Sequence, residues 1–308
     1  MLNSLYGAVE LGLLYALMSL GVYITFRILD FPDLTVDGSF AIGGAVAATL
    51  ITQGCSPWLA GLAAFGGGLA AGACTGLLHT KGKINGLLSG ILMMIALYSI
   101  NMRIMGKPNV SLLGIDIPFF SISSTGIRIL LIAVGVMLIK LLLDAFLHTD
   151  LGLALRATGD NARMIRSFGA HTDNTIVFGI SLSNGLVALS GALISQQNGF
   201  ADISMGLGMI VIGLASVIIG EAIFGARNVF FATLAAVLGS IVYRIIVALA
   251  LRAEWLSASD LKMITALIVI VALVVPSLQR SWKQRNVAKK RTAQLAVASS
   301  EQSVGGER

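Results

Sequence analysis

Charged residues are scarce in this 308-residue chain, in which Asp, Glu, Lys and Arg together make up 12% of the sequence. Soluble domains carry about 25% charged residues, so the composition excludes an ordinary water-soluble globular protein. Instead, 56% of the residues are hydrophobic, and they gather in several long runs. Because a helix pairs its backbone polar groups within one segment, we expect an all-α, polytopic bundle of membrane-spanning helices.

Cysteine and histidine are also rare, with two of the first and three of the second. About 19 residues of mostly helical rise would hold Cys55 and Cys74 tens of ångströms apart, too far for a disulfide, so we expect both to be packing residues. His79, His148 and His171 lack the spacing of a metal site. No Walker phosphate loop, nucleophile elbow or paired-cysteine site occurs either. We therefore expect no enzymatic activity and no cofactor or metal bound by this chain.

The apolar runs predict nine spans if each crossing needs about 20 residues. They cover residues 5–26, 35–52, 57–78, 85–105, 127–147, 175–195, 207–223, 229–250 and 260–278. The start of the chain lacks the basic cluster and the cleavage site of a signal peptide, so we expect the first run to be retained. Residues 1–278 then form the transmembrane domain. Residues 279–308 form a basic tail that we expect to be disordered and to lie beside the lipid.

Positive charge is unevenly divided between the two sides that nine crossings define. One side collects Arg27, Lys81, Lys83, Arg156, Arg163, Arg166, Arg227, Arg280, Lys283, Arg285, Lys289, Lys290, Arg291 and Arg308. The other holds Arg103, Lys107, Arg128, Arg252 and Lys262. Since cytoplasmic loops are enriched in Lys and Arg, we expect a plasma or inner membrane protein with its N-terminus outside and its C-terminus in the cytoplasm. The lipid leaflet accounts for the net charge of +6, so no nucleic-acid partner is expected.

One segment between two spans, residues 151–171 (LGLALRATGDNARMIRSFGAH), is too polar for hydrocarbon. Its charged residues are Arg156, Asp160, Arg163 and Arg166. The pattern predicts two short helices, with Asp160 capping a second helix that begins at Asn161 and ends near Gly169. Two interpretations remain open. The segment is either an ordinary loop on the positively charged side or a docking helix for a soluble partner.

Two further polar segments interrupt the apolar pattern where a translocation path could run. The first offers Asp33, Thr35, Asp37 and Ser39 just after Pro32, and the second offers Asn198, Asp202, Ser204 and Met205 on the outer side. The first segment is either an interfacial turn whose carboxylates favour the start of the next helix or a broken helix that lines a polar cavity. The second is either a simple loop or an outer gate. We name these eight residues as the candidate path.

Glycine is plentiful, with 35 residues, and Gly68, Gly72 and Gly76 repeat at four-residue spacing. Small residues on one helical face let helix backbones approach closely in lipid, so we expect tight packing along this face. Lys140 and Arg244 fall inside predicted spans, where an ionisable group is a functional hypothesis by default. If the span boundaries shift, both are near enough to an interface for their long side chains to reach it.

Three stretches together resemble a known family. They are LDFPDLTVDGSFAIGGAVAA, GLALRATGDNARMIRSFG and QNGFADISMGLGMIVIGLASVIIGEAIFG. The chain resembles, from about Leu11 to Pro276, the permease subunits of ATP-binding cassette (ABC) importers in the branched-chain amino acid and ribose permease superfamily. The likeness is greatest to the branch assigned to tryptophan or tyrosine transport. The chain departs from branched-chain permeases at LTVDGSF, so a leucine-type substrate should not be transferred to it.

The resemblance implies a role for the polar insert. In such importers this insert is the coupling helix, which lies in a groove of an ATP-binding subunit that holds ATP and Mg. The matching positions here are Gly152, Arg156, Ala157, Asp160, Asn161, Ala162, Met164, Ile165 and Gly169. The resemblance also implies a permease homodimer with a central path. A separate binding protein would deliver a small solute, an amino acid that could be aromatic, to outer loops 106–126 and 196–206.

Two other classes of membrane protein compete with an ABC permease. A secondary transporter driven by an ion gradient would need buried ionisable groups at mid-span and no cytoplasmic partner, whereas the charges here concentrate at span ends and in the insert. A passive channel or membrane scaffold is compatible with glycine-rich spans. Neither of these explains a capped helix at 161–168.

Overall fold

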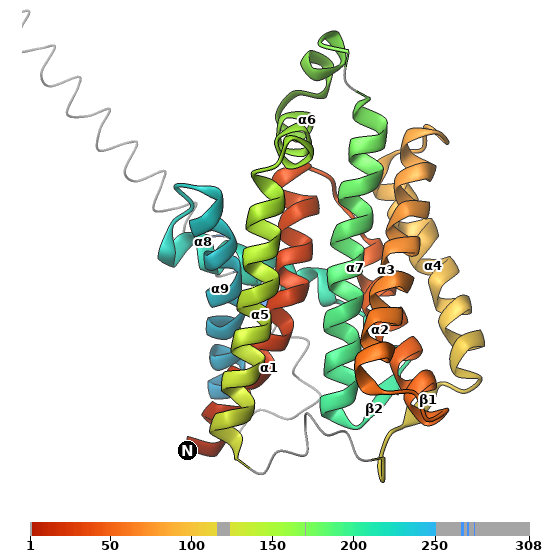
Figure 1. The fold of residues 1–308 in the computed structure, drawn as a ribbon, viewed down its shortest axis with the longest axis vertical. Helices are drawn as coiled ribbons and strands as arrows, with labels where there is room; N and C mark the ends of the chain where they lie inside the picture. The colour runs from red at the N-terminus through yellow and green to blue at the C-terminus, as the bar shows by residue number, and fades with distance from the viewer. Residues whose placement is uncertain are drawn as a thin grey trace, which may run out of the picture.

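The computed structural model describes residues 2–115, 124–169 and 171–250, together with residues 266, 267, 270 and 274. Within these residues the fold is an all-α bundle with one short β-ribbon (Figure 1). The elements are α1 (Leu2–Val22), the π-helix η1 (Tyr23–Ile28), α2 (Thr35–Thr52), α3 (Pro57–Thr80), α4 (Gly86–Met105), β1 (Asn109–Ser111), α5 (Thr125–Leu147), α6 (Asp150–Ser167), α7 (Thr172–Asn198), β2 (Phe200–Asp202), α8 (Met209–Phe224) and α9 (Val229–Ala250).

Seven of the nine predicted spans appear as helices long and apolar enough to cross a membrane. Their bounds are Leu5–Ile28, Thr35–Thr52, Pro57–Thr80, Gly86–Met105, Thr125–Leu147, Thr172–Asn198 and Val229–Ala250. The span predicted at 207–223 corresponds to α8, which has only 16 residues and is too short to meet the same criterion. Most of the ninth predicted span, at 260–278, lies outside the described residues, as does the tail at 279–308.

Local sequence explains several helix boundaries. Pro57 occupies the first turn of α3, where its missing N–H is not needed. The Asn85 side chain accepts a 3.0 Å hydrogen bond from Leu87 N and caps α4. Gly106 and Gly199 end α4 and α7 in the left-handed conformation, with φ of 67° and 74°. The spans therefore start and stop at residues suited to those positions.

The glycine face predicted on α3 is confirmed, and it packs against α7. A Cβ added at Gly68 would lie 2.3 Å from Asn184 O, and one added at Gly72 would lie 2.5 Å from Ile180 O. At Gly76 the nearest atom would be Val177 Cα, at 2.8 Å. No side chain fits at these distances, so the two backbones are in direct contact along about two turns.

The two ends of the bundle differ. One end, the α6 end, carries α6 beyond the tops of α1 and α7, and the opposite end carries the β-ribbon and the N-terminus (Figure 1). In the ribbon β1 pairs antiparallel with β2, with Val110 opposite Ala201. Leu112 N also donates to Gly199 O at 2.8 Å. The ribbon joins the loops that follow α4 and α7, which the sequence analysis places on the outer side. We call this end of the bundle the ribbon end.

Two expectations about individual side chains need correction. Cys55 and Cys74 are unpaired, as expected, but both are exposed on the protein surface rather than packed. Lys140 does not reach an interface: it is fully buried, its Nζ lies 2.5 Å from Asp144 Oδ2, and it stands over the Phe230 ring. The pairing explains the burial, because a buried ammonium group requires a counter-charge.

Candidate functional site

The polar insert forms α6, and it contains the two helical segments that the sequence predicts. Their junction is Asn161, whose φ of −158° and ψ of 86° are not helical. The cap differs from the prediction: the Asn161 side chain accepts a 3.0 Å hydrogen bond from Met164 N, a role expected of Asp160. An N-cap residue needs a non-helical backbone, and Asn161 has it, whereas Asp160 belongs to the preceding helical segment.

The first segment of α6, residues 150–160, is fixed to the bundle. Thr149 caps it by accepting a bond from Gly152 N at 3.3 Å, and Leu155 is completely buried. A Cβ at Gly159 would lie 1.8 Å from Ile28 O, so the helix rests directly on the backbone at the end of η1. A Cβ at Gly152 would likewise lie 2.3 Å from Phe146 O. The first segment is therefore in direct backbone contact with the ends of η1 and α5.

The second segment, residues 161–168, projects from the bundle and is the outermost part of α6 (Figure 1). Met164 is 50% exposed and Phe168 79% exposed, although both are large apolar side chains. Arg166 holds the end of the segment: its Nε donates to Thr172 Oγ1 at 2.6 Å, and its guanidinium pairs with Asp173 at 3.0 Å. The result is an apolar surface with basic flanks held away from the membrane domain.

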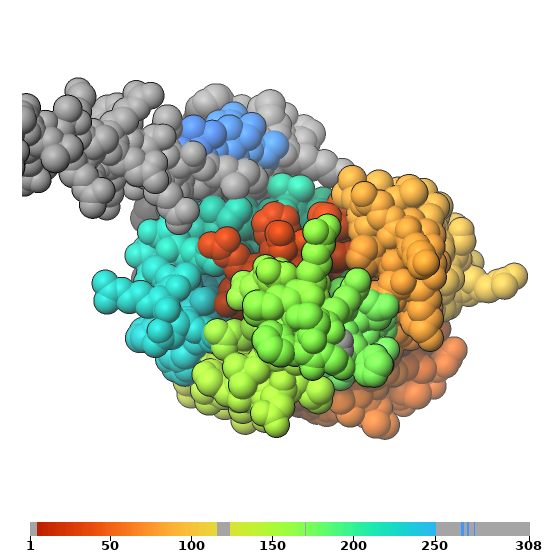
Figure 2. All heavy atoms as spheres, turned by 90° about the horizontal axis from the view of Figure 1, so that it is seen from above, coloured from red at the N-terminus to blue at the C-terminus, as the bar shows by residue number. Residues whose placement is uncertain are grey.

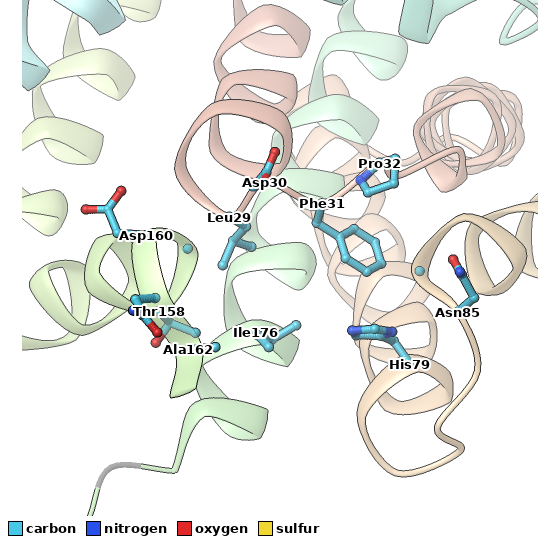
Figure 3. Close-up of a pocket in the computed structure, with 13 residues that line it drawn as sticks. Leu29, Asp30, Phe31, Pro32, His79, Asn85, Thr158, Asp160, Ala162 and Ile176 are labelled. Carbon is cyan, nitrogen blue, oxygen red and sulfur yellow. The ribbon is translucent and has the colours of Figure 1, made fainter. Parts of the chain in front are cut away.

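A cavity lies on each side of the junction between the two segments. The first, of about 420 Å³, is bounded by the linker after η1, the α3–α4 turn and α6 (Figure 3). Its lining includes Phe31, His79, Thr158, Asp160 and Ala162. The second, of about 520 Å³, is lined by Arg27, His148, Arg156, Glu221 and Arg227 among others. Asp160 lines both cavities, so the junction lies between them.

The second cavity is rich in charge. Arg27 Nε donates to Glu221 Oε1 at 2.8 Å and ties η1 to the end of α8. Arg156 comes from the first segment of α6, and Arg227 from the turn between α8 and α9. Viewed onto this end, α6 lies over the middle of the molecule, with the α8–α9 turn on one side and the α3–α4 turn on the other (Figure 2).

The first polar segment is not an interfacial turn. After η1 the chain returns towards the middle of the bundle before α2 begins (Figure 1), and Asp33 and Thr35 are buried. Asp33 Oδ1 accepts from Thr35 N at 2.9 Å, and Asp33 Oδ2 accepts from Asn184 Nδ2 at 2.6 Å. The Thr35 hydroxyl lies 2.8 Å from that of Thr75. The broken-helix interpretation fits the backbone, but Asp33, Thr35 and Ser39 are closed off from solvent in this conformation.

Asp37 connects two helices at their starting points. It lies in the first turn of α2, and its carboxylate accepts hydrogen bonds from Gly208 N at 2.9 Å and Ile210 N at 2.8 Å. Those N–H groups belong to the start of α8, where an anion is favoured by the unpaired amides and the helix dipole. A Cβ at Gly206 would meet Asp37 O at 1.9 Å. The start of α8 is thus fixed to the start of α2 inside the protein.

The remaining candidate path residues lie at or near the ribbon end. Asn198 ends α7 and is exposed, whereas Met205 packs with its sulfur against Gly44 of α2. Asp202 accepts hydrogen bonds from both the N–H and the hydroxyl of Ser204. The hydroxyl bond is the main reason that the pKa of Asp202 lies below its ordinary value; partial burial opposes the shift. The eight path residues therefore form two groups at different depths, and their role in transport stays a prediction.

Sequence reasoning missed several groups that the structure brings to these sites. Asn184 holds Asp33, and Glu10 pairs with Arg128 at 2.6 Å near the ribbon end. The sequence signal that could have revealed them is a single amide or carboxylate side chain within an apolar span, because such a group needs a polar partner in hydrocarbon. Among the described residues no cluster of three or more His, Cys, Asp or Glu side chains could hold a metal ion.

Comparison with known proteins identifies the family. Residues 5–274 match the model of the branched-chain amino acid transport system permease component. The chain is 43% identical over 275 residues to the tyrosine transport system permease protein of Clostridioides difficile, covering 89% of this chain and 92% of that one. It is 39% identical over 204 residues to an uncharacterized protein of Rickettsia prowazekii, covering 66% of this chain and 71% of the relative.

A more distant relative is the ribose import permease protein of Escherichia coli, 26% identical over 201 residues, with 62% of this chain and 61% of the relative covered. No solved structure matches the chain. The family match covers α1 from residue 5 onwards and every later helix that the structure describes, including α6, together with both polar segments. The chain belongs to the family of branched-chain amino acid transport system permease components, and it is a multi-pass membrane protein.

Proposed function

We propose that this permease is the membrane-spanning subunit of an ATP-driven importer and that α6 is its coupling helix. The observation that carries the proposal is the division of α6 at Asn161 into an anchored and a projecting segment. The projecting segment offers Met164 and Phe168 to a partner. Large apolar side chains exposed together and flanked by charge are typical of a protein interface.

The anchored segment supplies the mechanical link. Closure of two ATP-binding subunits around ATP and Mg would push on residues 161–168. The contact of Gly159 with Ile28 O would pass that displacement to η1 and so to α1. The cavities on both sides of Asp160 leave room for the junction to tilt. ATP hydrolysis belongs to the partner in this proposal, and this chain contributes only the docking surface.

The proposed orientation places the α6 end in the cytoplasm. Basic residues of the described elements gather there, namely Arg27, Lys81, Lys83, Arg156, Arg163, Arg166 and Arg227, whereas Arg103, Lys107 and Arg128 lie towards the ribbon end. This asymmetry supports the positive-inside orientation. The extracytoplasmic binding protein would then dock at the ribbon end, where Leu113 is 83% exposed. A second copy of the chain would complete the path.

An amino acid, aromatic in type, is the proposed cargo. The proposal follows the 43% identity with a permease whose name states tyrosine transport, over nearly the full length of both chains. The ribose import permease is a much weaker match. The candidate path residues supply carboxylate, hydroxyl and amide groups, the types that bind an ammonium or a hydroxyl group of a solute.

A gradient-driven secondary transporter is a weaker alternative. Four carboxylates, those of Asp33, Asp37, Glu10 and Asp144, are nevertheless buried inside the protein. Each of these four has a partner: amide and backbone donors for Asp33 and Asp37, and cations for Glu10 and Asp144. An ion-coupling carboxylate must exchange its ion with water, and these closed pairs do not offer that exchange.

Two matched phenylalanines test the docking assignments. Phe168→Ala removes an exposed side chain at the α6 end, and Phe200→Ala removes one at the ribbon end. We expect Phe168→Ala to weaken capture of the ATP-binding subunit by roughly 30-fold, the loss that a 2 kcal/mol interface anchor represents. Phe200→Ala should leave that capture unchanged. Co-purification in mild detergent and binding titration measure both, and equal behaviour of the two variants would refute the coupling-helix assignment.

Cargo identity needs a separate measurement. The complex with its ATP-binding subunit and binding protein, reconstituted in vesicles, should hydrolyse ATP faster with tyrosine or tryptophan than with leucine or ribose. Uptake should persist when an ionophore collapses the ion gradients and should stop when ATP is withheld. Uptake that follows the gradient instead, without an associated ATPase, would support the secondary transporter.

A further inference from the structure

An apolar groove runs along the membrane-facing surface in the half of the bundle nearer the ribbon end. Its walls are α3 and α5 and its floor is α1 and α7, with a volume of about 260 Å³. The lining is Leu14, Leu17, Pro57, Trp58, Gly61, Leu62, Leu131, Ile132, Gly135, Val136, Ile139, Leu189, Leu193 and Gln196. We call it the α3–α5 groove. None of the proposed transport roles uses it.

The polarity of the groove changes with depth. Trp58 and Gln196 lie close to the ribbon-end termini of α3 and α7, whereas Leu17 and Ile139 lie well inside α1 and α5. Trp58 is 70% exposed, a position typical of the membrane–water interface. The groove therefore begins at the level of lipid headgroups and runs towards the bilayer centre between purely apolar side chains.

Gln196 supplies a hydrogen-bond donor without an acceptor. Its side chain is only 5% exposed, and within the described part of the chain its Nε2 has no hydrogen-bond partner. A buried amide without a partner is costly in an apolar environment. Because Nε2 is itself enclosed by protein atoms, an acceptor oxygen of an occupant reaches it only when the Gln196 side chain turns into the groove. The site then favours an occupant with an acceptor oxygen at the interface and a long apolar portion below it.

We propose that the α3–α5 groove binds one acyl chain of a membrane phospholipid, whose ester carbonyl accepts a hydrogen bond from Gln196 Nε2. A zwitterionic amino acid would not fit, because no charged side chain lines the groove. One acyl chain has the matching shape and polarity.

Gly135 offers a way to fill the groove without disturbing the fold. It lines the groove on α5, and a Cβ added there would meet no atom within 4 Å. Gly126, also on α5, is equally open but does not line the groove. Gly135→Leu should therefore block the acyl chain, and Gly126→Leu serves as the matched control. Both variants keep Trp58 on the opposite wall as a reporter.

The experiment measures quenching of Trp58 fluorescence in the full chain, with Trp255 and Trp282 replaced by Phe. Phosphatidylcholine with dibrominated acyl chains is titrated into the detergent-purified protein. We expect quenching that saturates at a low lipid mole fraction. Gly135→Leu should raise the half-saturating fraction at least tenfold, and Gly126→Leu should leave it unchanged.

The hydrogen bond is tested by competition. Unbrominated ester-linked lipid should displace the brominated lipid more effectively than its ether-linked analogue, which lacks the carbonyl, and Gln196→Leu should abolish this difference. Quenching that rises in proportion to lipid without saturating, or that ignores Gly135→Leu, would overturn the proposal. So would a dimer that shields Trp58 and dissociates in Gly135→Leu, because the groove would then belong to a second copy.

Discussion

Asp37 shows how a single buried side chain organises this permease. Its carboxylate accepts two backbone N–H groups at the start of α8, although it belongs to α2. An acceptor at that place satisfies donors that have no partner within their own helix. Asp37 is therefore a structural tie between two helices before it is a candidate contact for cargo.

Replacing Asp37 tests this tie. Asp37→Asn keeps the shape but turns one acceptor into a donor that faces backbone N–H groups, so we expect a loss of about 2 kcal/mol in the free energy of unfolding. Asp30→Asn is the control, because Asp30 is exposed and its φ of 50° is tolerated by Asn. Denaturant unfolding of the purified protein compares the two. If both variants unfold at the same denaturant concentration, the hydrogen bonds of Asp37 to the start of α8 do not contribute to stability.

Asp202 makes the ribbon end sensitive to acid. Its pKa in the folded protein lies below the ordinary value because of the Ser204 hydroxyl bond. A lowered pKa gives stability that is present above the unfolded pKa and is lost as the pH falls through the folded pKa. Ser204→Ala should raise the pKa of Asp202 and move this loss to higher pH. Infrared titration of the carboxyl band, with Asp202→Asn subtracted, measures the midpoint, and an unchanged midpoint contradicts the assignment.

At the scale of elements, glycines decide which helices pack against each other, because a glycine has no side chain to keep two backbones apart. On α3 the glycines that face α7 have backbone atoms within 3 Å of an added Cβ, whereas Gly66 on the same helix has open space. The same principle fixes α6 on η1 through Gly159. Glycine spacing therefore determines which helices touch and how closely.

Gly72 and Gly66 form a matched pair for this principle. Gly72→Ala would force its Cβ to within 2.5 Å of Ile180 O, so α3 and α7 must separate, at a cost of about 1–3 kcal/mol. Gly66→Ala should be neutral or slightly stabilising, since Ala is the better helix former. Thermal unfolding in detergent measures the difference. A Gly72→Ala protein as stable as Gly66→Ala would show that the close contact is dispensable.

At the scale of the whole molecule, the proposed orientation can be read from a native cysteine. Cys55 is exposed in the turn between α2 and α3, at the opposite end from the α3–α4 turn that holds Lys83. In a Cys74→Ser background, which removes the other exposed cysteine, we expect a membrane-impermeant maleimide to label Cys55 in intact cells. When Cys55→Ser is added to that background, Lys83→Cys should be labelled only after the membrane is opened. The reverse pattern would invert the proposed topology.

Much of the candidate site could be predicted from local patterns. A break in α6 just after Gly159 follows from the capping residue types Asp160 and Asn161, and seven span positions follow from continuous apolar length. The partners of Asp33 and Asp37 could not be predicted, because Asn184 and Gly208 are more than 150 residues away in the chain. The prediction of Asp160 as the cap was wrong because Asp and Asn are both good capping residues, and only the backbone angles show that Asn161 is the non-helical one.

The sequence by itself determined the membrane environment, the helical class, the family and the position of the polar insert, because these depend on local apolar length, charge and motif. The tertiary structure alone decided that α8 starts inside the bundle, that both carboxylates of the first polar segment are paired, and that only half of α6 projects. Those outcomes depend on which helices meet. In hydrocarbon that choice follows from close backbone contact and the pairing of polar groups, which a sequence pattern does not specify.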